Sequence, residues 1–183
     1  MRFEQANIYE QVFASWLREH RVRFADVDQS KRFCPEQEGI KNFDFLIRPG
    51  SHDSILVEVK GRTCRSSTLA GLRGLDGWVP FEDVQSLSCW QRCFQEKTPG
   101  AGAVFVFVFT LEQIDIETDG QAVYDFDGGR YLLLAVSLEH YRACMKPRSS
   151  RWQTVTVSAE DFRRYAVPIR DIFCAERYRD NKR

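Results

Sequence analysis

The chain has 183 residues, 43% of them hydrophobic and 13% aromatic, so it has enough apolar side chains to form the core of a folded domain. This composition excludes a chain that is disordered throughout. The 26 basic and 26 acidic residues leave no net charge, which excludes a general polyanion binder but not a local basic patch.

Hydrophobic periodicity predicts the elements of the first 111 residues. Ile8, Val12 and Trp16 recur at helical spacing. The run AVFVFVF at 103–109 is apolar throughout, which is typical of a strand buried on both faces. In chain order we expect a helix over 5–19, strands over 21–28, 42–50 and 55–61, a helix over 81–96 and a strand over 103–110, with loops over 29–41 and 61–80.

Residues 112–183 lack a core of convincing size of their own, so we expect them to extend the same sheet within a single domain, 1–183. Their predicted elements are a turn at 124–131, strands over 131–137 and 151–157, and helices over 138–145 and 158–165. Residues 141–183 carry 11 Lys or Arg against 5 Asp or Glu. This basic end is either a phosphate-binding surface or a solvated face that balances the acidic middle of the chain.

The location of the protein is predicted from two absences in the sequence. The first residues, MRFEQANIYEQVF, contain no apolar stretch of the kind found in signal peptides. The longest apolar run, at 103–109, is too short to span a bilayer. We therefore expect a cytoplasmic protein without membrane contact, whose six cysteines are mostly reduced thiols.

Residues 54–61 read SILVEVKG, in which apolar and polar residues alternate as in a strand. Side chains two apart on a strand share a face, so Glu58 and Lys60 point the same way. If this strand and the preceding one form a hairpin closed near 50–53, Asp44 lies beside Glu58 on that face. The other face of the preceding strand is expected to carry Phe43, Phe45 and Ile47.

Two neighbouring carboxylates raise one another's pKa unless a cation is present. Carboxylate oxygens are ligands that suit Mg²⁺, and a bound divalent ion stabilises charge on a phosphoryl oxygen. An adjacent lysine can orient the attacking water. Asp44, Glu58 and Lys60 are therefore a chemically complete set for metal-assisted phosphodiester hydrolysis. The alternative is an amphipathic hairpin on which Glu58 and Lys60 form a solvated ion pair.

Asp44, followed after 13 residues by Glu58-Val59-Lys60 between two predicted helices, resembles the motif of the PD-(D/E)xK nuclease superfamily. That superfamily includes restriction endonucleases and Holliday-junction resolvases. The resemblance covers about 1–111 and implies an α/β restriction-endonuclease-like core: a mixed central sheet flanked by helices in the order α-β-β-β-α-β. Residues 112–183 would then form a C-terminal α+β extension. Phe43 stands where the motif often has proline.

The resemblance also implies roles for residues. Asp44 and Glu58 would hold Mg²⁺, for which Mn²⁺ can substitute, and Lys60 would assist the attacking water. Some members add an acid from the first helix, for which Glu10 is the candidate; an exposed helix glutamate is the alternative. Some carry a polar residue on the helix after the lysine strand. Gln85 is the candidate there, with Gln91 and Arg92 as weaker choices.

Three arginines in the expected loop over 61–80 are candidates for contacts with DNA phosphates: Arg62, Arg65 and Arg73. An ordinary surface loop is the alternative. The sequence thus predicts a metal-dependent DNA endonuclease, with branched or otherwise structured DNA as a candidate substrate and a homodimer as a candidate assembly. A non-catalytic nucleic-acid-binding or scaffold domain on the same fold and an RNA nuclease remain alternatives.

Overall fold

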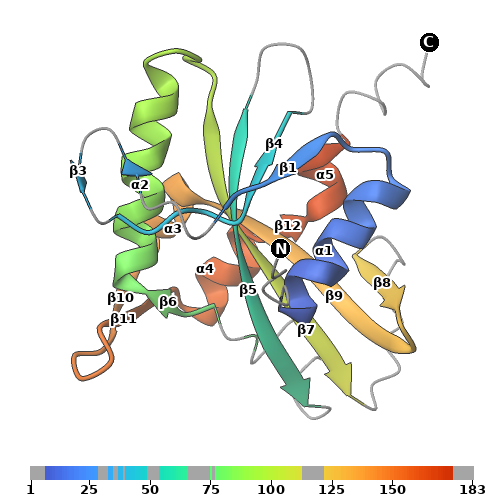
Figure 1. The fold of residues 1–183 in the computed structure, drawn as a ribbon. Coiled ribbons are helices and arrows are strands. Elements are labelled where there is room, and N and C mark those ends of the chain that lie inside the picture. The colour runs from blue at the N-terminus through green and yellow to red at the C-terminus, as the bar shows by residue number, and fades with distance from the viewer. Residues whose placement is uncertain are drawn as a thin grey trace.

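The computed structural model describes residues 7–28, 33–34, 37–38, 40–48, 54–65, 75, 77–112 and 122–174 (Figure 1). The helices are α1 (Ile8–Glu19), α2 (Phe81–Gln95), α3 (Leu138–Cys144), α4 (Ala159–Tyr165) and α5 (Ile169–Phe173). The strands are β1 (Phe24–Asp26), β2 (Phe33–Cys34), β3 (Gln37–Glu38), β4 (Phe45–Ile47), β5 (Ile55–Arg65), β6 (Val79–Pro80), β7 (Gly102–Glu112), β8 (Val123–Phe126), β9 (Gly129–Ser137), β10 (Lys146–Ser149), β11 (Thr154–Thr156) and β12 (Val167–Pro168). None of the helices in the described ranges has both the length and the apolar character needed to cross a membrane.

A mixed seven-stranded sheet organises the molecule. Its strand order is β1-β4-β5-β7-β9-β12, with β8 paired to β9. Only β5 and β7 are parallel; the other pairs are antiparallel. The prediction of an α/β fold with a mixed central sheet flanked by helices is confirmed. The strands β8, β9 and β12 bring residues from beyond 111 into the same sheet.

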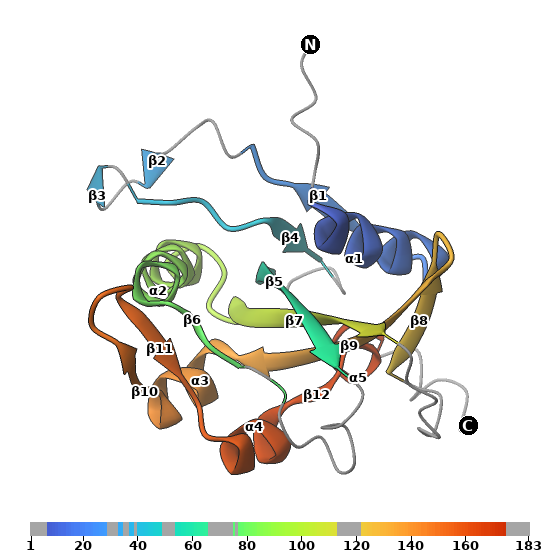
Figure 2. The same cartoon turned by 90° about the horizontal axis from the view of Figure 1, so that it is seen from below.

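Two hydrophobic clusters cover the two faces of this sheet, with α2, α3 and α4 packed on one and α1 and α5 on the other (Figures 1 and 2). Strand β7 serves both clusters because alternate side chains point to opposite faces. Phe105, Phe107 and Phe109 lie in the cluster with α2, whereas Val104 and Val106 lie in the cluster with α1. The continuous apolar run therefore fits a central strand, as predicted.

Several predicted element boundaries are wrong. Residues of the expected loop over 29–41 include the short antiparallel pair β2 and β3. Strand β5 runs to Arg65 because β7 offers a parallel partner along its whole length. The single strand expected over 151–157 is the second half of a hairpin, β10–β11. Helix α5 and strand β12 were not expected at all, and β6 lies in what was expected to be a loop over 61–80.

The face assigned to Phe43 is also corrected. Phe45 and Ile47 lie in the cluster with α1, as the alternation predicts. Phe43 instead packs edge-on against Trp90 and Phe94 of α2, with ring centroids 5.7 and 5.9 Å apart. The regular pleat does not extend back to Phe43, because β4 begins only at Phe45.

A second, three-stranded sheet, in the order β10-β11-β6, stands beside the first residues of α2. Strand β6 leads directly into that helix. The phenol of Tyr141, fully buried on α3, donates to the carbonyl of Gly77 at 2.6 Å and to that of Val155 at 3.2 Å. These contacts join the C-terminal hairpin to the segment that enters α2.

Candidate active site

The candidate site lies where β5 has no further neighbour on one side among the described strands. Strand β4 pairs with β5 only as far as Phe45 opposite Val57, while β5 continues to Arg65 beside β7. This register places Asp44 opposite Glu58. The starts of α1 and α2 approach this open edge from the two faces of the sheet. Side chains from two strands and two helices can therefore meet at one place.

Four charged side chains form a closed ring of ion pairs at this edge. Lys41 Nζ lies 2.5 Å from Glu58 Oε1 and 2.9 Å from Asp83 Oδ1. Lys60 Nζ lies 2.8 Å from the same Glu58 oxygen and 2.5 Å from Asp83 Oδ2. The Glu58 and Asp83 side chains are only 4% exposed, so both acids depend on these lysines for charge compensation.

Asp44 stands next to this ring and continues the β4–β5 ladder with its side chain. Its backbone N–H donates to the Val57 carbonyl at 2.9 Å, and its Oδ2 accepts from the backbone N–H of Val59 at 2.7 Å. Burial raises the pKa of Asp44, and the Glu58 carboxylate raises it further. The Val59 N–H and Lys60 oppose this, and the resulting pKa is about 8. At neutral pH the Asp44 carboxyl group is therefore mainly protonated.

Glu10 reaches the same group of charges from the first turn of α1. Burial raises the pKa of its carboxyl above the usual value, and Glu58 adds to this effect, while Lys41 and Lys60 lower it. The contact of Tyr9, the residue before Glu10, with Gly61 explains how α1 comes so close to β5. A Cβ atom on Gly61 would lie 1.9 Å from Cδ2 of the Tyr9 ring, so only glycine leaves room for that ring against β5.

Packing against α2 places Lys41. The indole N–H of Trp90 donates to the Lys41 carbonyl at 3.1 Å. Burial lowers the pKa of the Lys41 ammonium, but the Glu58 and Asp83 carboxylates outweigh it, so the net pKa lies above the ordinary value. Lys41 is therefore a fixed positive charge of the site.

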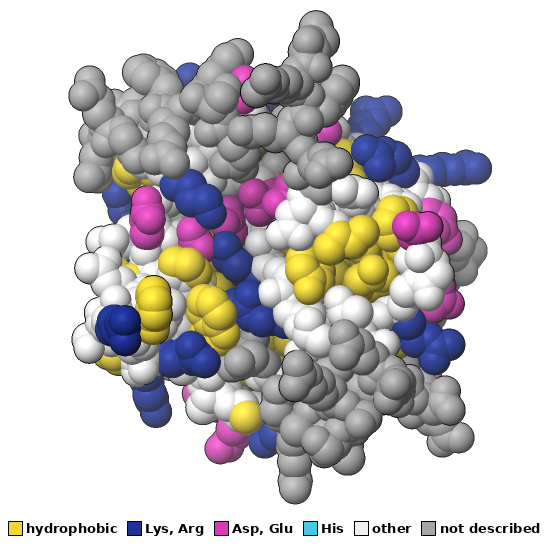
Figure 3. All heavy atoms as spheres, turned by 60° about the horizontal axis from the view of Figure 1, so that its bottom comes forward, with side chains coloured by type: hydrophobic (Ala, Val, Ile, Leu, Met, Phe, Trp, Pro, Cys, Tyr) yellow, Lys and Arg dark blue, Asp and Glu magenta, His cyan; other side chains and the backbone are white. Residues whose placement is uncertain are grey.

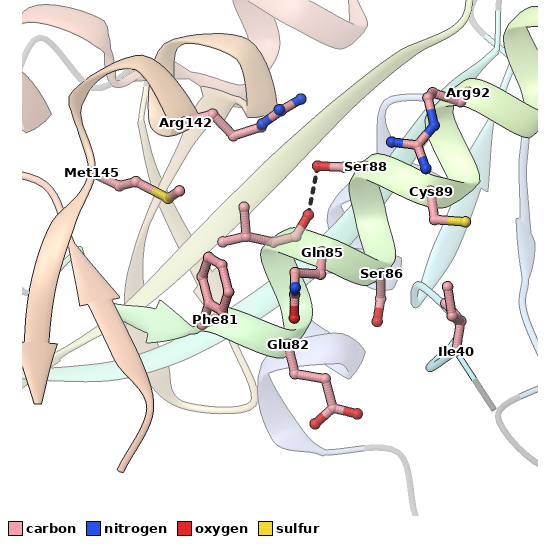
Figure 4. A pocket seen from close by; sticks show the side chains of 11 residues that line it. Ile40, Phe81, Glu82, Gln85, Ser86, Ser88, Cys89, Arg92, Arg142 and Met145 are labelled. Carbon is pink, nitrogen blue, oxygen red and sulfur yellow. Dashed lines mark hydrogen bonds between the residues drawn. The ribbon is translucent and has the colours of Figure 1, made fainter. Parts of the chain in front are cut away.

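The structure brings together four of the five predicted catalytic residues: Glu10, Asp44, Glu58 and Lys60. Gln85 does not join them. Its side chain is exposed and lines a separate pocket of about 450 Å³ on the outer side of α2, together with Glu82 and Arg142 (Figure 4). The polar side chain that α2 contributes to the site is Asp83 instead.

Lys41 and Asp83 were not predicted as site residues. Asp83 was visible in the sequence only as an acid in the first turn of a predicted helix, where it suits the positive end of the helix dipole. Lys41 lies at the end of an expected loop, and no motif marks it. Only the packing of α2 on the sheet brings these two residues together.

Of the three predicted DNA-contacting arginines, Arg62 can be placed. Its guanidinium donates to the carbonyls of Gly61 and Trp78 and lies 4.1 Å from the centroid of the Trp78 ring. Arg62 is thus held half-buried beside the site. Arg65 ends β5, but its side chain lies outside the described part of the structure, as does the whole of Arg73.

The donor set at the site fits a hard divalent cation such as Mg²⁺ or Mn²⁺. Four carboxyl groups, on Glu10, Asp44, Glu58 and Asp83, lie near two ammonium groups, and carboxylate oxygens are the ligands that such an ion prefers. Burial first, and then the neighbouring Glu58 and Glu10 carboxylates, raise the pKa of Asp44. Within the described ranges, no group of three or more His, Cys, Asp or Glu side chains is already arranged as a metal site.

Acidic and basic side chains also lie side by side on the surface of the molecule. In Figure 3, acidic side chains gather near the middle of the face and lie directly beside basic ones. Basic and hydrophobic side chains share the side where β10 and β11 lie.

In comparisons with known proteins, neither a family model nor a curated protein sequence matches this chain.

Proposed function

We propose that this protein is a metal-dependent nuclease that hydrolyses DNA phosphodiester bonds on a restriction-endonuclease-like core. The observation that carries the proposal is the meeting of Asp44, Glu58 and Lys60 at the open edge of β5, with Glu10 beside them. Such a cluster of buried acids around two lysines is unusual for a purely structural sheet edge, since each buried charge must be compensated.

Each residue has a chemical task in this proposal. Asp44, Glu58 and Glu10 would hold the divalent ion, which when bound supplies positive charge at the scissile phosphate. Lys60, only 12% exposed, orients the attacking water through its ammonium group. Asp83 holds the Lys60 ammonium from the other side at 2.5 Å and so fixes its direction. Water adds to phosphorus and gives up a proton to solvent, the bond from phosphorus to the bridging oxygen breaks, and that oxygen takes up a proton from solvent.

One observation favours a second function, a nucleic-acid-binding or scaffold domain without turnover. Lys41 and Lys60 both contact the same oxygen of Glu58. In this arrangement the ammonium groups already compensate the carboxylate that a metal would need. A protein that kept the ion-pair ring permanently closed would retain the fold and the basic surface but would not cleave.

A cleavage assay separates the two functions. Wild-type protein is incubated with plasmid, single-stranded DNA, branched DNA and RNA, with Mg²⁺, Mn²⁺ or EDTA. We expect metal-dependent cleavage of DNA, which Lys60→Ala and Asp44→Asn each reduce at least about 100-fold. The amide oxygen introduced by Asp44→Asn can still accept the Val59 N–H bond, so this variant tests the charge rather than the fold. Lys97→Ala, at an exposed position of the chain, is the matched control.

The results distinguish the candidates directly. Metal-dependent cleavage that is lost in both variants supports the nuclease. DNA binding without cleavage by the wild type supports the scaffold and rejects the nuclease. Cleavage of RNA alone would assign the activity to an RNA nuclease. Equal cleavage by wild type and both variants would show that the activity arises elsewhere.

A further inference from the structure

The hairpin formed by β10 and β11 is basic and carries an exposed aromatic side chain at its tip. Between Glu139 and Glu160 the chain has no acidic residue; its four basic ones are Arg142 on α3 and Lys146, Arg148 and Arg151 on the hairpin. All four are exposed. Trp152 follows in the turn and is 68% exposed, far more than the other exposed large hydrophobic side chains in the described part of the protein, Ile8 and Phe81. The Arg151 guanidinium lies 5.1 Å from the Trp152 ring centroid.

This hairpin is fixed to the element that supplies Asp83. Strand β11 pairs with β6, with Thr154 opposite Pro80 and Val155 opposite Val79. The backbone N–H of Phe81, the first residue of α2, donates to the carbonyl of Gln153 at 2.8 Å. The tip of the hairpin therefore has a defined position relative to the start of α2 and to the candidate site.

Basic and aromatic side chains connect the site with the hairpin. Arg62 follows Lys60 by two residues on β5, and its guanidinium lies 4.1 Å from the Trp78 ring centroid. The guanidinium of Arg148, on β10, lies 5.0 Å from the same centroid. Figure 3 shows basic and hydrophobic side chains together on this side of the face. A strand of phosphates leaving the site would meet positive charge along this path.

We propose that the β10–β11 hairpin binds single-stranded DNA beside the cleavage site, an inference that rests on the nuclease function proposed above. The basic residues would contact the phosphates, and the Trp152 ring would stack on an unpaired base. In duplex DNA the bases are already stacked on one another, so their faces are closed to Trp152. The substrate class is therefore DNA with a single-stranded segment, such as a flap, an overhang or an open branch.

Fluorescence anisotropy tests the hairpin separately from catalysis. A short labelled single-stranded oligonucleotide is titrated with the protein in EDTA, beside a version that lacks bases, a duplex, and an RNA of the same sequence. We expect the single strand to bind more tightly than the duplex or the RNA. Trp152→Ala should weaken its binding by about fivefold to a hundredfold, and Trp152→Phe by much less. On the oligonucleotide without bases, Trp152→Ala and wild type should bind alike.

Two further variants sharpen the test. Arg151→Gln should lower the slope of log affinity against log salt concentration by about 0.7, the value for one phosphate contact on a single strand. Ile8→Ala, which removes another exposed apolar side chain, is the matched control and should bind as wild type does. Equal binding of the single strand by wild type and Trp152→Ala overturns the proposal, as does tighter binding of duplex or of RNA.

This binding result and the cleavage result can fail independently. Single-strand binding that depends on Trp152 in a protein that never cleaves would support the hairpin and reject the nuclease. Metal-dependent cleavage with no effect of Trp152→Ala on single-strand binding would support the nuclease and reject the hairpin.

Discussion

Lys41 Nζ lies 2.5 Å from Glu58 Oε1, the same oxygen that the Lys60 ammonium contacts. Glu58 is almost fully buried, and its charge is compensated by two lysines from different parts of the chain. Lys60 is adjacent in the strand, whereas Lys41 arrives through its packing on α2. The buried acids of the site therefore depend on a residue outside the sequence motif.

Removing the Lys41 ammonium should destabilise the metal-free protein. Lys41→Met leaves Lys60 as the remaining cation of the ring for both Glu58 and Asp83, and we expect the free energy of unfolding to fall by about 1–3 kcal/mol at pH 8. Denaturant unfolding in EDTA measures it. Lys97→Met, at an exposed position, is the control and should change stability little. Equal stability of the two variants would mean that Lys41 does not compensate the buried acids.

Asp44 should make stability depend on pH. Its pKa is about 8 in the folded protein against 3.8 ordinarily, so between these values the folded state binds a proton that the unfolded state has lost. Stability then falls as pH rises from about 4 to 8 and levels off above. Asp44→Asn cannot ionise, so its advantage over wild type should be absent near pH 4 and exceed about 1 kcal/mol at pH 8.5. Unfolding curves in EDTA at both pH values measure the difference; a constant difference between them would contradict the raised pKa.

Gly61 should be needed for the approach of α1 to the site. In Gly61→Ala the new methyl group would overlap the Tyr9 ring, so we expect a loss of about 1–3 kcal/mol and weaker cleavage as Glu10 is displaced. Gly102→Ala on β7 is the matched control, since a Cβ there meets no atom within 4 Å. The double variant Gly61→Ala/Tyr9→Ala should lose less than the two single changes added together. Simple additivity would show that the ring and the methyl group do not collide.

Substitutions of Asp83 and of Gln85, both on α2, should have different effects on cleavage. Asp83→Asn removes a buried charge that holds Lys60, so cleavage should fall by about 10- to 100-fold. Glu82→Gln makes a comparable change at the exposed neighbouring position and should have little effect. Gln85→Ala should stay within about threefold of wild type, because that side chain faces a different pocket. A large loss in Gln85→Ala with none in Asp83→Asn would reverse this assignment, and initial cleavage rates on one DNA substrate decide it.

The sequence by itself was enough to place Asp44, Glu58 and Lys60 together. Side chains two apart on a strand share a face, and a short hairpin sets its own register, so local rules suffice for these residues. The same rules predicted the buried strand β7 and the helices α1 and α2 to within a few residues. They also predicted a mixed sheet with helices on its faces.

Tertiary structure alone decided which further charges reach the site. Helical positions two apart point about 200° away from each other, so a site that takes Asp83 leaves Gln85 on the outside. Which of the two faces inward depends on the rotation of α2 against the sheet, which is set by contacts such as Phe43 with Trp90. Long-range packing also brings Lys41 to the site and the β10–β11 hairpin to the start of α2. The periodicity of a short segment carries no information about this packing, because the contacts join residues far apart in the chain.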